Sequence, residues 1–397
     1  MDAARRGRRG ARSAPGGLPG HFSLLWLALA LVAAAWPAAV HAQILRPHLA
    51  WRTIETEHFA FHFPAELEPW ARHVAERMES VREEVAPLVG SAPRRRTTVI
   101  VDDPYNQVNG IAYSMIAGPV IYLWPNPPDP RSMLGNLRSF PEELAVHEYT
   151  HIAHLTRPSR RPVRRLIALI VPSARERAMP RPPRWMAEGY ATYVEGKLTG
   201  SGRPHGVYRP SVLRQWALEG RLPSYAQLNG SAAYQGDAFA YLAGSAFIEW
   251  LAARKGDSSL VLLWRRLSAR QRRSFDDAFA GVYGGLPADL YGRFTVEMTA
   301  GALEAQRALA ESGADTGTVV QRLNWSTGNP ALSADGKLMA LTLRSTPNRP
   351  GRIVVWETAE APDTMAAKRR ERLSKLDPED VPAIEYQPPP KRAVSTL

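Results

Sequence analysis

The 397-residue chain contains no cysteine. Disulfide bonds, thiolate metal sites, cysteine nucleophiles and cysteine-linked lipid anchors are therefore all excluded. Exported proteins often use disulfides, so an exported chain without them must be stabilised by its hydrophobic core alone. Hydrophobic residues make up 45% of the sequence, which is normal for a globular protein and sufficient for a sizeable core.

The sequence also lacks a nucleic-acid-binding motif, although it is basic. The formal net charge is +12, and the first 42 residues contribute +4 of it through five arginines and one aspartate, which leaves +8. Since the arginines are spread along the chain and accompany no such motif, we predict no nucleic-acid partner. The positive excess favours contact with anionic surfaces, including a membrane surface.

Residues 1–42 have the pattern of a secretory signal peptide. A basic start precedes the apolar run FSLLWLALALVAAAW, and the small residues of AAVHA follow it. This order predicts export, with cleavage after Ala42. The alternative is an uncleaved membrane anchor, but the apolar core is short for a membrane span. We expect the protein in the periplasm or outside the cell, and association with a membrane stays open.

Residues 43–310 show the periodicity of an α+β domain. Alternation of apolar and polar residues predicts one strand from Ile54 to Phe63, another at TTVIVDD, and two more around Gly118-Pro119. Between the first two strands, apolar residues recur every three or four positions as far as Gly90, which predicts an amphipathic helix.

Three helices are predicted next, at SFPEELAVHEYTHIAHL, PRWMAEGYATYVEG and GDAFAYLAGSAFIEWLAARKG. Ser139, followed three residues later by Glu142, fits a capping box at the start of the first helix. The segment DDAFAGVYGGLPADLYGRFTVEM is expected to form one helix, or two short ones divided at Gly284-Gly285. A strand-rich beginning followed by helices predicts the α+β fold class.

The character of the sequence changes after residue 310. Residues 311–322 are rich in small polar residues and predict a linker. Residues 323–357 hold two alternating apolar runs joined at Asp335-Gly336, then a third at RIVVWE, which predicts a hairpin and one more strand. Residues 358–397 are charged and proline-rich, and we predict a disordered tail.

The segment VHEYTH carries the strongest chemical signal. Residues four apart lie on one face of a helix, so His147 and His151 can both point at one zinc ion. Glu148 lies about 100° around the helix from His147, beside the metal rather than on it. There it can take a proton from a zinc-bound water that attacks a carbonyl group, which is the chemistry of HExxH. The alternative is two surface histidines, but the flanking apolar residues predict a buried helix, and buried histidines need partners.

A catalytic zinc needs a third protein ligand and one open position. Glu188 is the best candidate, because its helix is largely apolar and a buried carboxylate there requires a metal or another partner. Gly189 would let this helix approach the HExxH helix closely. The alternative is a solvated Glu188, with Gly189 merely loosening the helix. Glu195 is a weaker candidate because we expect it in solvent at the helix end.

His154 is the other candidate ligand near the motif. One straight helix can hardly supply three ligands to a tetrahedral ion, so we expect His154 to contact a ligand or the helix end instead.

HEYTH together with WMAEGYATYVEG resembles the gluzincin branch of zinc metallopeptidases, the thermolysin- and aminopeptidase-like clan. More narrowly, the chain resembles exported bacterial proteins with a peptidase MA-like domain, in which a W-x-x-EG-x-A-x-Y helix follows the HExxH helix. The resemblance covers about Trp51–Met298, although the gap between the two motifs is longer than in thermolysin-like members. It implies a gluzincin-like domain with a small mixed sheet and a helical lobe. It also implies His147, His151 and Glu188 as zinc ligands and Glu148 as the catalytic base.

Such enzymes usually add a tyrosine or histidine that stabilises the oxyanion. Our choice is Tyr234, in the loop-like segment AAYQGDAF, and Tyr190, Tyr193 and Tyr241 compete with it. Each of these could instead be a core aromatic residue, and for Tyr241 we favour that interpretation.

The insert between the two motif helices holds nine arginines around an apolar strip, Leu166–Val171. One interpretation is a lid or a membrane-facing element, because basic residues that flank apolar ones suit an anionic surface. We favour an ordinary connector whose apolar strip packs on the domain.

The segment PALSADGKLMAL, followed by RIVVWE, resembles one repeat of a TolB-like β-propeller. A propeller needs about four or more blades, and one repeat cannot bury its own face. We expect a truncated propeller; docking on the peptidase domain and pairing with another chain are the alternatives. Because propellers commonly bind partners, the segment implies a protein partner.

Together these patterns predict an exported zinc metallopeptidase that acts on peptides or proteins. The absence of a GAMEN-like exopeptidase motif favours an endopeptidase. The alternative is a catalytically silent, peptidase-like platform for a propeller, although such a platform would have no chemical need for Glu148. A weaker alternative is zinc-dependent hydrolysis of a non-peptide substrate.

Overall fold

The computed structural model describes residues 46, 48–103, 108–114, 118–129, 132–163, 166–167, 182–229, 238–314, 330–343, 352–359, 364–376 and 393–396. The chain divides into two units, residues 1–50 and 51–397. The predicted signal peptide and its cleavage site lie outside the described residues. No helix in these ranges is long and apolar enough to cross a membrane.

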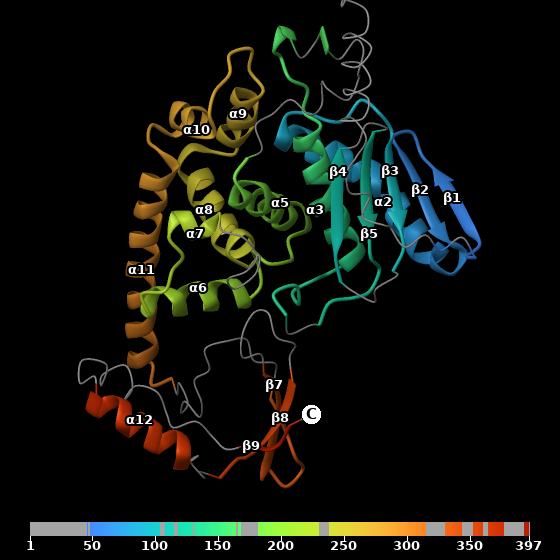
Figure 1. The fold of residues 1–397 in the computed structure, drawn as a ribbon. Helices are drawn as coiled ribbons and strands as arrows, with labels where there is room; N and C mark the ends of the chain where they lie inside the picture. Colours follow the sequence, from blue (N-terminus) through green and yellow to red (C-terminus); the bar gives the residue numbers. More distant parts are fainter. Residues whose placement is uncertain are drawn as a thin grey trace, which may run out of the picture. The chain divides into compact units, whose positions relative to one another are not determined.

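A five-stranded mixed sheet opens the second unit (Figure 1). The three central strands are parallel, and the two edge strands pair antiparallel with their neighbours. On the second strand Phe59, Phe61 and Phe63 are fully buried, as the period of two requires for a strand with one face on the core. The spatial order is β1 (Trp51–Glu55), β2 (Phe59–Pro64), β3 (Thr97–Val101), β5 (Pro119–Leu123) and β4 (Gly110–Ser114).

The single strand predicted from Ile54 to Phe63 is wrong, because β1 and β2 form a hairpin. Glu79 stabilises its turn, accepting hydrogen bonds from the Thr56 hydroxyl at 2.6 Å and the His58 backbone N–H at 2.8 Å. Residues 55–58, ETEH, are all polar, so the apolar alternation is interrupted at the turn, and the prediction of one strand overlooked this break.

Two helices pack against this sheet. After a short 3-10 turn, η1 (Ala65–Leu67), helix α2 (Glu68–Val89) contacts β2, and α3 (Phe140–Leu155) contacts β4, β5 and α2. Helix α2 ends at Gly90, as predicted, with a φ of 71°. Ser139 caps α3 by accepting the Glu142 backbone N–H, but the Glu142 carboxylate bonds the Arg77 guanidinium at 2.8 Å instead of closing the box.

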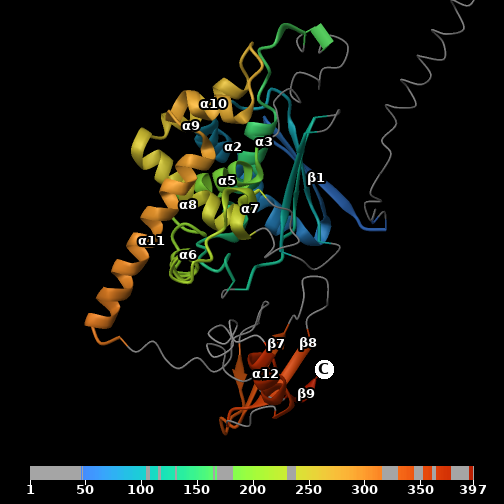
Figure 2. The ribbon, with the colours of Figure 1, turned by 60° about the vertical axis from the view of Figure 1, so that its left-hand side comes forward.

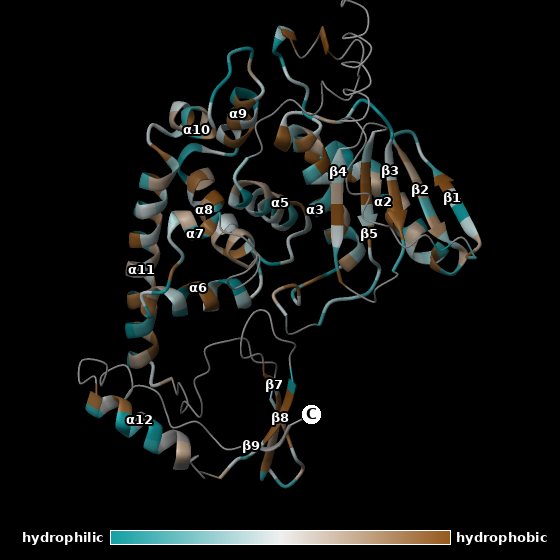
Figure 3. Cartoon of the chain, viewed as in Figure 1, coloured by the Kyte–Doolittle hydropathy of each residue, from teal (hydrophilic) through white to brown (hydrophobic). Residues whose placement is uncertain are grey.

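The remainder of this region is helical. Helix α8 is apolar almost all round and packs along α5, while α11 runs beside α6, α7 and α8 (Figures 1, 2 and 3). Of the two alternatives for this segment, the structure shows the division at Gly284-Gly285, although α11, with 25 residues, is not short. Helices α6, α7 and α9 were not predicted. The helices are α5 (Arg184–Thr199), α6 (Tyr208–Leu218), α7 (Tyr225–Leu228), α8 (Ala238–Lys255), α9 (Ser258–Leu267), α10 (Phe275–Tyr283) and α11 (Pro287–Glu311). The predicted α+β class, with a helical lobe and a small mixed sheet, is confirmed.

The C-terminal region contains a separate antiparallel sheet, in the order β6 (Ala331–Leu332), β7 (Leu338–Leu343), β8 (Arg352–Glu357) and β9 (Ala393–Thr396). The hairpin at Asp335-Gly336 and the next strand are as predicted. Leu341, Val354 and Trp356 form its small core. The described residues contain no closed propeller.

The prediction that residues 358–397 are wholly disordered is wrong for two segments. Helix α12 (Thr364–Leu376) consists largely of good helix formers, and Lys375 pairs with Glu371 one turn away at 2.9 Å. Strand β9 pairs with β8. Composition misses this strand because it does not show that β8 offers an open edge.

Gly189 brings α5 close to α8, not to the HExxH helix as predicted. A Cβ at Gly189 would lie 2.6 Å from the carbonyl carbon of Gly244, and one at Gly244 would lie 2.8 Å from the Trp185 carbonyl oxygen. Both of these close atoms belong to the backbone, so a side chain at either glycine would fit only if α5 or α8 moved.

We expect Gly189→Ala to lower the free energy of unfolding by about 1–3 kcal/mol, because it overpacks the contact between α5 and α8. Gly301→Ala is the matched control, since a Cβ there meets nothing within 4 Å and Gly301 lies inside α11. The control should stabilise the protein by about 0.5–1 kcal/mol. Urea unfolding of both variants measures the difference, and equal effects would contradict the close-contact explanation.

Candidate metal centre

Three side chains from two helices converge between α3 and α5. The Nε2 atoms of His147 and His151 lie 3.2 Å apart. Oε2 of Glu188 lies 3.2 Å from His151 Nε2 and 3.7 Å from His147 Nε2. Two ligands held tetrahedrally at about 2.1 Å from one zinc ion lie about 3.4 Å apart, so the spacing suits one ion. No other His, Asp or Glu cluster in the described ranges brings three such atoms together.

The charges of this cluster support one another. Burial would raise the pKa of Glu188, but the charge of His151 and hydrogen bonds from both histidines outweigh it and hold that pKa far below its usual range. Burial opposes charge on His147 too, yet hydrogen bonds to Glu188 and Glu195 raise its pKa to about 9. A cation at this point would satisfy the same carboxylate that now attracts both imidazoles.

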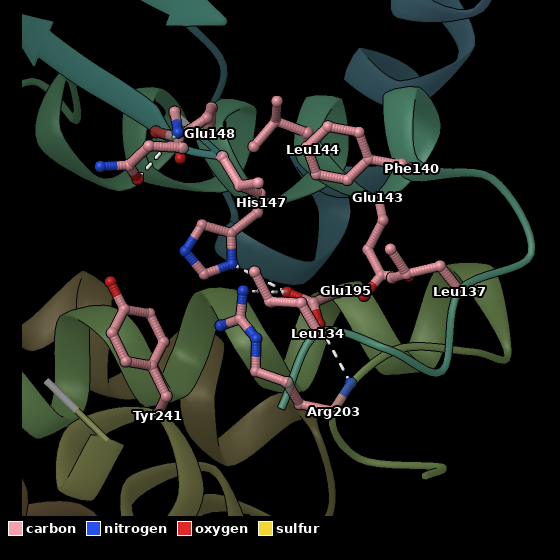
Figure 4. Close-up of a pocket in the computed structure, with 13 residues that line it drawn as sticks. Leu134, Leu137, Phe140, Glu143, Leu144, His147, Glu148, Glu195, Arg203 and Tyr241 are labelled. Atoms are coloured by element: carbon pink, nitrogen blue, oxygen red, sulfur yellow. Dashed lines mark hydrogen bonds and ion pairs between the residues drawn. The ribbon is translucent and has the colours of Figure 1, made fainter. Parts of the chain in front are cut away.

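Glu148 is 4% exposed and lies beside the cluster, facing a pocket of about 450 Å³ (Figure 4). Its carboxylate lies against Gly110 at the start of β4, where a Cβ would come within 2.6 Å of Glu148 Oε1. Burial raises the pKa of Glu148. Apolar and polar side chains both line the pocket, and Tyr241 and Arg203 are among the polar ones. The apolar lining residues are Val108, Leu134, Leu137, Phe140 and Leu144.

Glu195 was predicted to lie in solvent, but it is fully buried. It accepts a hydrogen bond from His147 Nδ1 at 2.9 Å and lies 3.4 Å from Arg203 Nη2. Burial would raise the pKa of Glu195, but the charge of Arg203 and the bond from His147 lower it to about 2. The prediction failed because the chain turns back after Gly200, and Ser201–Arg203 cover the carboxylate. The signal in the sequence was the spacing of seven residues from Glu188, which puts both carboxylates on one face of α5.

Glu143 extends this network from α3. Ser201 Oγ donates to Glu143 Oε2 at 3.2 Å, and Gly202, with a φ of 77°, leaves no room for a side chain beside the two carboxyl groups. Burial and the charge of Glu195 raise the pKa of Glu143 to about 9, so it is neutral near pH 7. A neutral Glu143 beside a charged Glu195 avoids two buried like charges.

His154 contacts a candidate ligand, as predicted, and does not join the cluster. Its Nε2 lies 3.0 Å from His151 Nδ1, and its ring stacks on Trp264 at 4.9 Å between centroids. Burial and the charge of His151 lower the pKa of His154 well below its usual value, so a neutral ring faces His151.

Of the candidate tyrosines, Tyr241 lies in the site, so the expectation of a core residue there is wrong. Its ring lies 5.9 Å from that of His147, with the Arg203 guanidinium 4.7 Å from its centre. Burial, the charge of Glu188 and a hydrogen bond with Glu188 raise the pKa of Tyr241. Tyr190 and Tyr193 instead bond the Leu88 carbonyl and Asp257, away from the cluster. Tyr234 lies outside the described residues.

The apolar strip of the insert is not buried where the structure describes it. Leu166 is 67% exposed and Ile167 44%, so the expected packing on the domain is wrong for these two residues. Residues 168–181 lie outside the described ranges.

No protein-family model matches this chain, and no curated protein matches it. Solved structures with some likeness include yeast LTA4 hydrolase, at 11% identity and a TM-score of 0.39 over 61% of this chain and 38% of that one. A Colwellia psychrerythraea protein described as a lipoprotein matches at 16% identity and a TM-score of 0.28, over 60% of this chain and 44% of that one. The match spans less than half the length of either structure. Neither likeness is strong enough to carry an argument about activity.

We expect Glu195→Gln to weaken zinc binding about 10–100-fold, because the charge that orients and polarises His147 is lost while the shape is kept. Competition with a chelating indicator measures the affinity. The control is Glu304→Gln, an exposed glutamate on α11. Unchanged affinity in Glu195→Gln would show that this carboxylate only fills space.

We expect Glu143→Gln to gain stability relative to the unchanged protein as the pH rises from 5 to 8. The pKa of Glu143 is about 9 when folded against 4.5 for the free group, so the folded protein retains a proton that the unfolded chain loses. The free energy of unfolding of the unchanged protein therefore falls with rising pH by on the order of 1 kcal/mol per pH unit. The Glu143→Gln variant has a neutral side chain at this position and does not show this loss. Urea unfolding at both pH values, in the presence of a chelator, measures it. A constant difference between the two proteins would contradict the raised pKa.

Proposed function

We propose that this chain is an exported zinc metallopeptidase that cleaves peptide bonds. The observation that carries the proposal is the convergence of His147, His151 and Glu188 at zinc-ligand spacing, with the buried carboxylate of Glu148 beside them. His147, His151 and Glu188 would hold the ion. A zinc ion bound there would supply Lewis-acid chemistry, lowering the pKa of a water molecule and polarising a carbonyl group.

Glu148 has the environment of a general base. Its carboxylate is fixed against Gly110 and its pKa is raised by burial, which brings its basicity closer to the working pH. In this proposal an Oε atom of Glu148 takes the proton of the attacking water and passes it to the leaving amine. Glu195 holds His147 with Nδ1 protonated, which leaves Nε2 free to ligate.

Strand β4 supports a peptide as the substrate. It is an edge strand of the five-stranded sheet, and its first residue, Gly110, touches the proposed base. An extended peptide can bind such an edge through its backbone, as an added strand. The apolar residues of the adjacent pocket, Leu137, Phe140 and Leu144, would then contact one apolar side chain of that peptide.

A tyrosine completes the proposal. Tyr241 is the described tyrosine best placed to donate a hydrogen bond to the developing oxyanion, since its ring lies close to both His147 and Arg203. Tyr234 remains a prediction from the sequence. Cleavage within proteins rather than at their ends, and a protein partner for residues 323–357, are likewise proposals.

Metal content and two substitutions test this function. The full chain, purified without a chelator or histidine tag, should contain about one zinc per chain, and Glu188→Ala should lose it. Glu148→Gln should retain zinc but hydrolyse casein about 10²–10⁴-fold more slowly, because the general base is lost. Glu304→Gln is again the matched control.

Two results would overturn the proposal. Failure to bind zinc supplied at neutral pH would leave no basis for a zinc enzyme. Zinc binding with hydrolysis unaffected by Glu148→Gln would favour the non-catalytic platform instead.

A further inference from the structure

A second pocket, of about 470 Å³, opens where the C-terminal ends of α2, α3 and α9 meet. Three arginines, Arg157, Arg160 and Arg265, line it with two serines, Ser91 and Ser268. None of the described residues that line it is acidic. It shares no lining residue with the pocket beside Glu148.

Arg157 is the buried member of this set, at 8% exposure. Its Nε donates to Ser268 Oγ at 3.0 Å and its Nη1 to the Val89 carbonyl at 2.6 Å, both of which are neutral acceptors. Burial and the like charges of Arg160 and Arg265 lower the pKa of Arg157 to about 10. Its neighbours therefore oppose the charge of this guanidinium.

The other two arginines are not neutralised either. Arg160 donates from Nη2 to the Arg265 carbonyl at 2.9 Å, while its buried Nε has no hydrogen-bond partner among the described residues. Throughout the described residues, no carboxylate forms an ion pair with Arg157, Arg160 or Arg265. By contrast, Arg77 and Arg209 each bond a glutamate within 3 Å.

Helix capping accounts for part of this arrangement. Arg157 and Arg160 bond carbonyls at the C-terminal ends of α2 and α9, where a positive charge is favourable. Capping does not explain Arg265, whose exposed guanidinium makes no hydrogen bond to a described residue and adds a third like charge. Three guanidinium groups around one opening, without a carboxylate, are the chemistry that binds an oxyanion.

We propose that this pocket binds a phosphate group. Planar guanidinium donors suit the oxygens of a tetrahedral anion, and the Ser91 hydroxyl at the rim adds a further donor. The phosphate could belong to a soluble ligand or to an anionic lipid headgroup. The next segment of chain exposes Val163, Leu166 and Ile167, at 67%, 67% and 44%, as a lipid surface would require.

The first experiment uses inorganic phosphate and the full chain. At constant ionic strength, replacing chloride by saturating phosphate should raise the Tm by about 2–5 °C. Arg265→Gln should abolish most of that rise, and it removes no hydrogen bond to a described residue. Arg293→Gln, with the same charge change at an exposed position of α11, should retain the rise. Glu188→Ala should also retain it, which separates this pocket from the metal centre.

The second experiment identifies the source of the phosphate. Flotation with phosphatidylglycerol vesicles, compared with phosphatidylcholine vesicles, tests the lipid headgroup. Binding to the former that Arg265→Gln loses and Arg293→Gln keeps assigns the pocket to a lipid. A phosphate-dependent rise in Tm without vesicle binding assigns it to a soluble ligand. No rise beyond that in chloride, or equal rises in Arg265→Gln and the unchanged protein, would overturn the proposal.

Discussion

The hydrogen bond between His147 and Glu195 is the interaction on which the rest of the site depends. It lies in a buried seam between α3 and α5, where ionisable side chains would be costly without partners. The charges there are balanced: Arg203 offsets Glu195, Glu188 attracts the imidazoles of His147 and His151, and Glu143 stays protonated and neutral. A metal ion fits this seam because the three candidate ligand atoms meet at one point.

Three glycines make the seam geometrically possible. Gly110 admits the Glu148 carboxylate beside β4, and Gly202 admits the Glu143 and Glu195 pair. Gly189 lets α5 lie against α8 at backbone distance, which leaves its other face to present Glu188 towards α3. A side chain at any of these positions would collide with a carboxylate or with backbone. The proposed active site and the packing of the helices therefore both require glycine at these positions. The arginine pocket at the far end of α3 shows the opposite condition, because its positive charges have no described carboxylate to neutralise them.

The local patterns predicted much of this structure. Periodicity of 3.6 located α2, α3, α5 and α8, because each buries one stripe or nearly its whole surface. Alternation located β3, β4 and β5, and the Asp335-Gly336 turn located the C-terminal hairpin. The prediction from alternation missed the turn at Thr56–His58. The contacts that stabilise this turn come from Glu79, which lies 21 residues from His58 in the sequence. The prediction also missed β9, whose partner strand lies far away in the sequence.

Helical spacing relates residues within one motif, so the two histidines on one helical face, the base beside them and the carboxylate on a second helix could all be read from the sequence. The surroundings of these groups depend instead on tertiary packing. Glu195 is buried because the loop after Gly200 folds back, Tyr241 enters the site because α8 packs along α5, and Gly189 faces α8 rather than α3. Burial and charge pairing are set by contacts between segments distant in the chain, and no local period encodes which segments will meet.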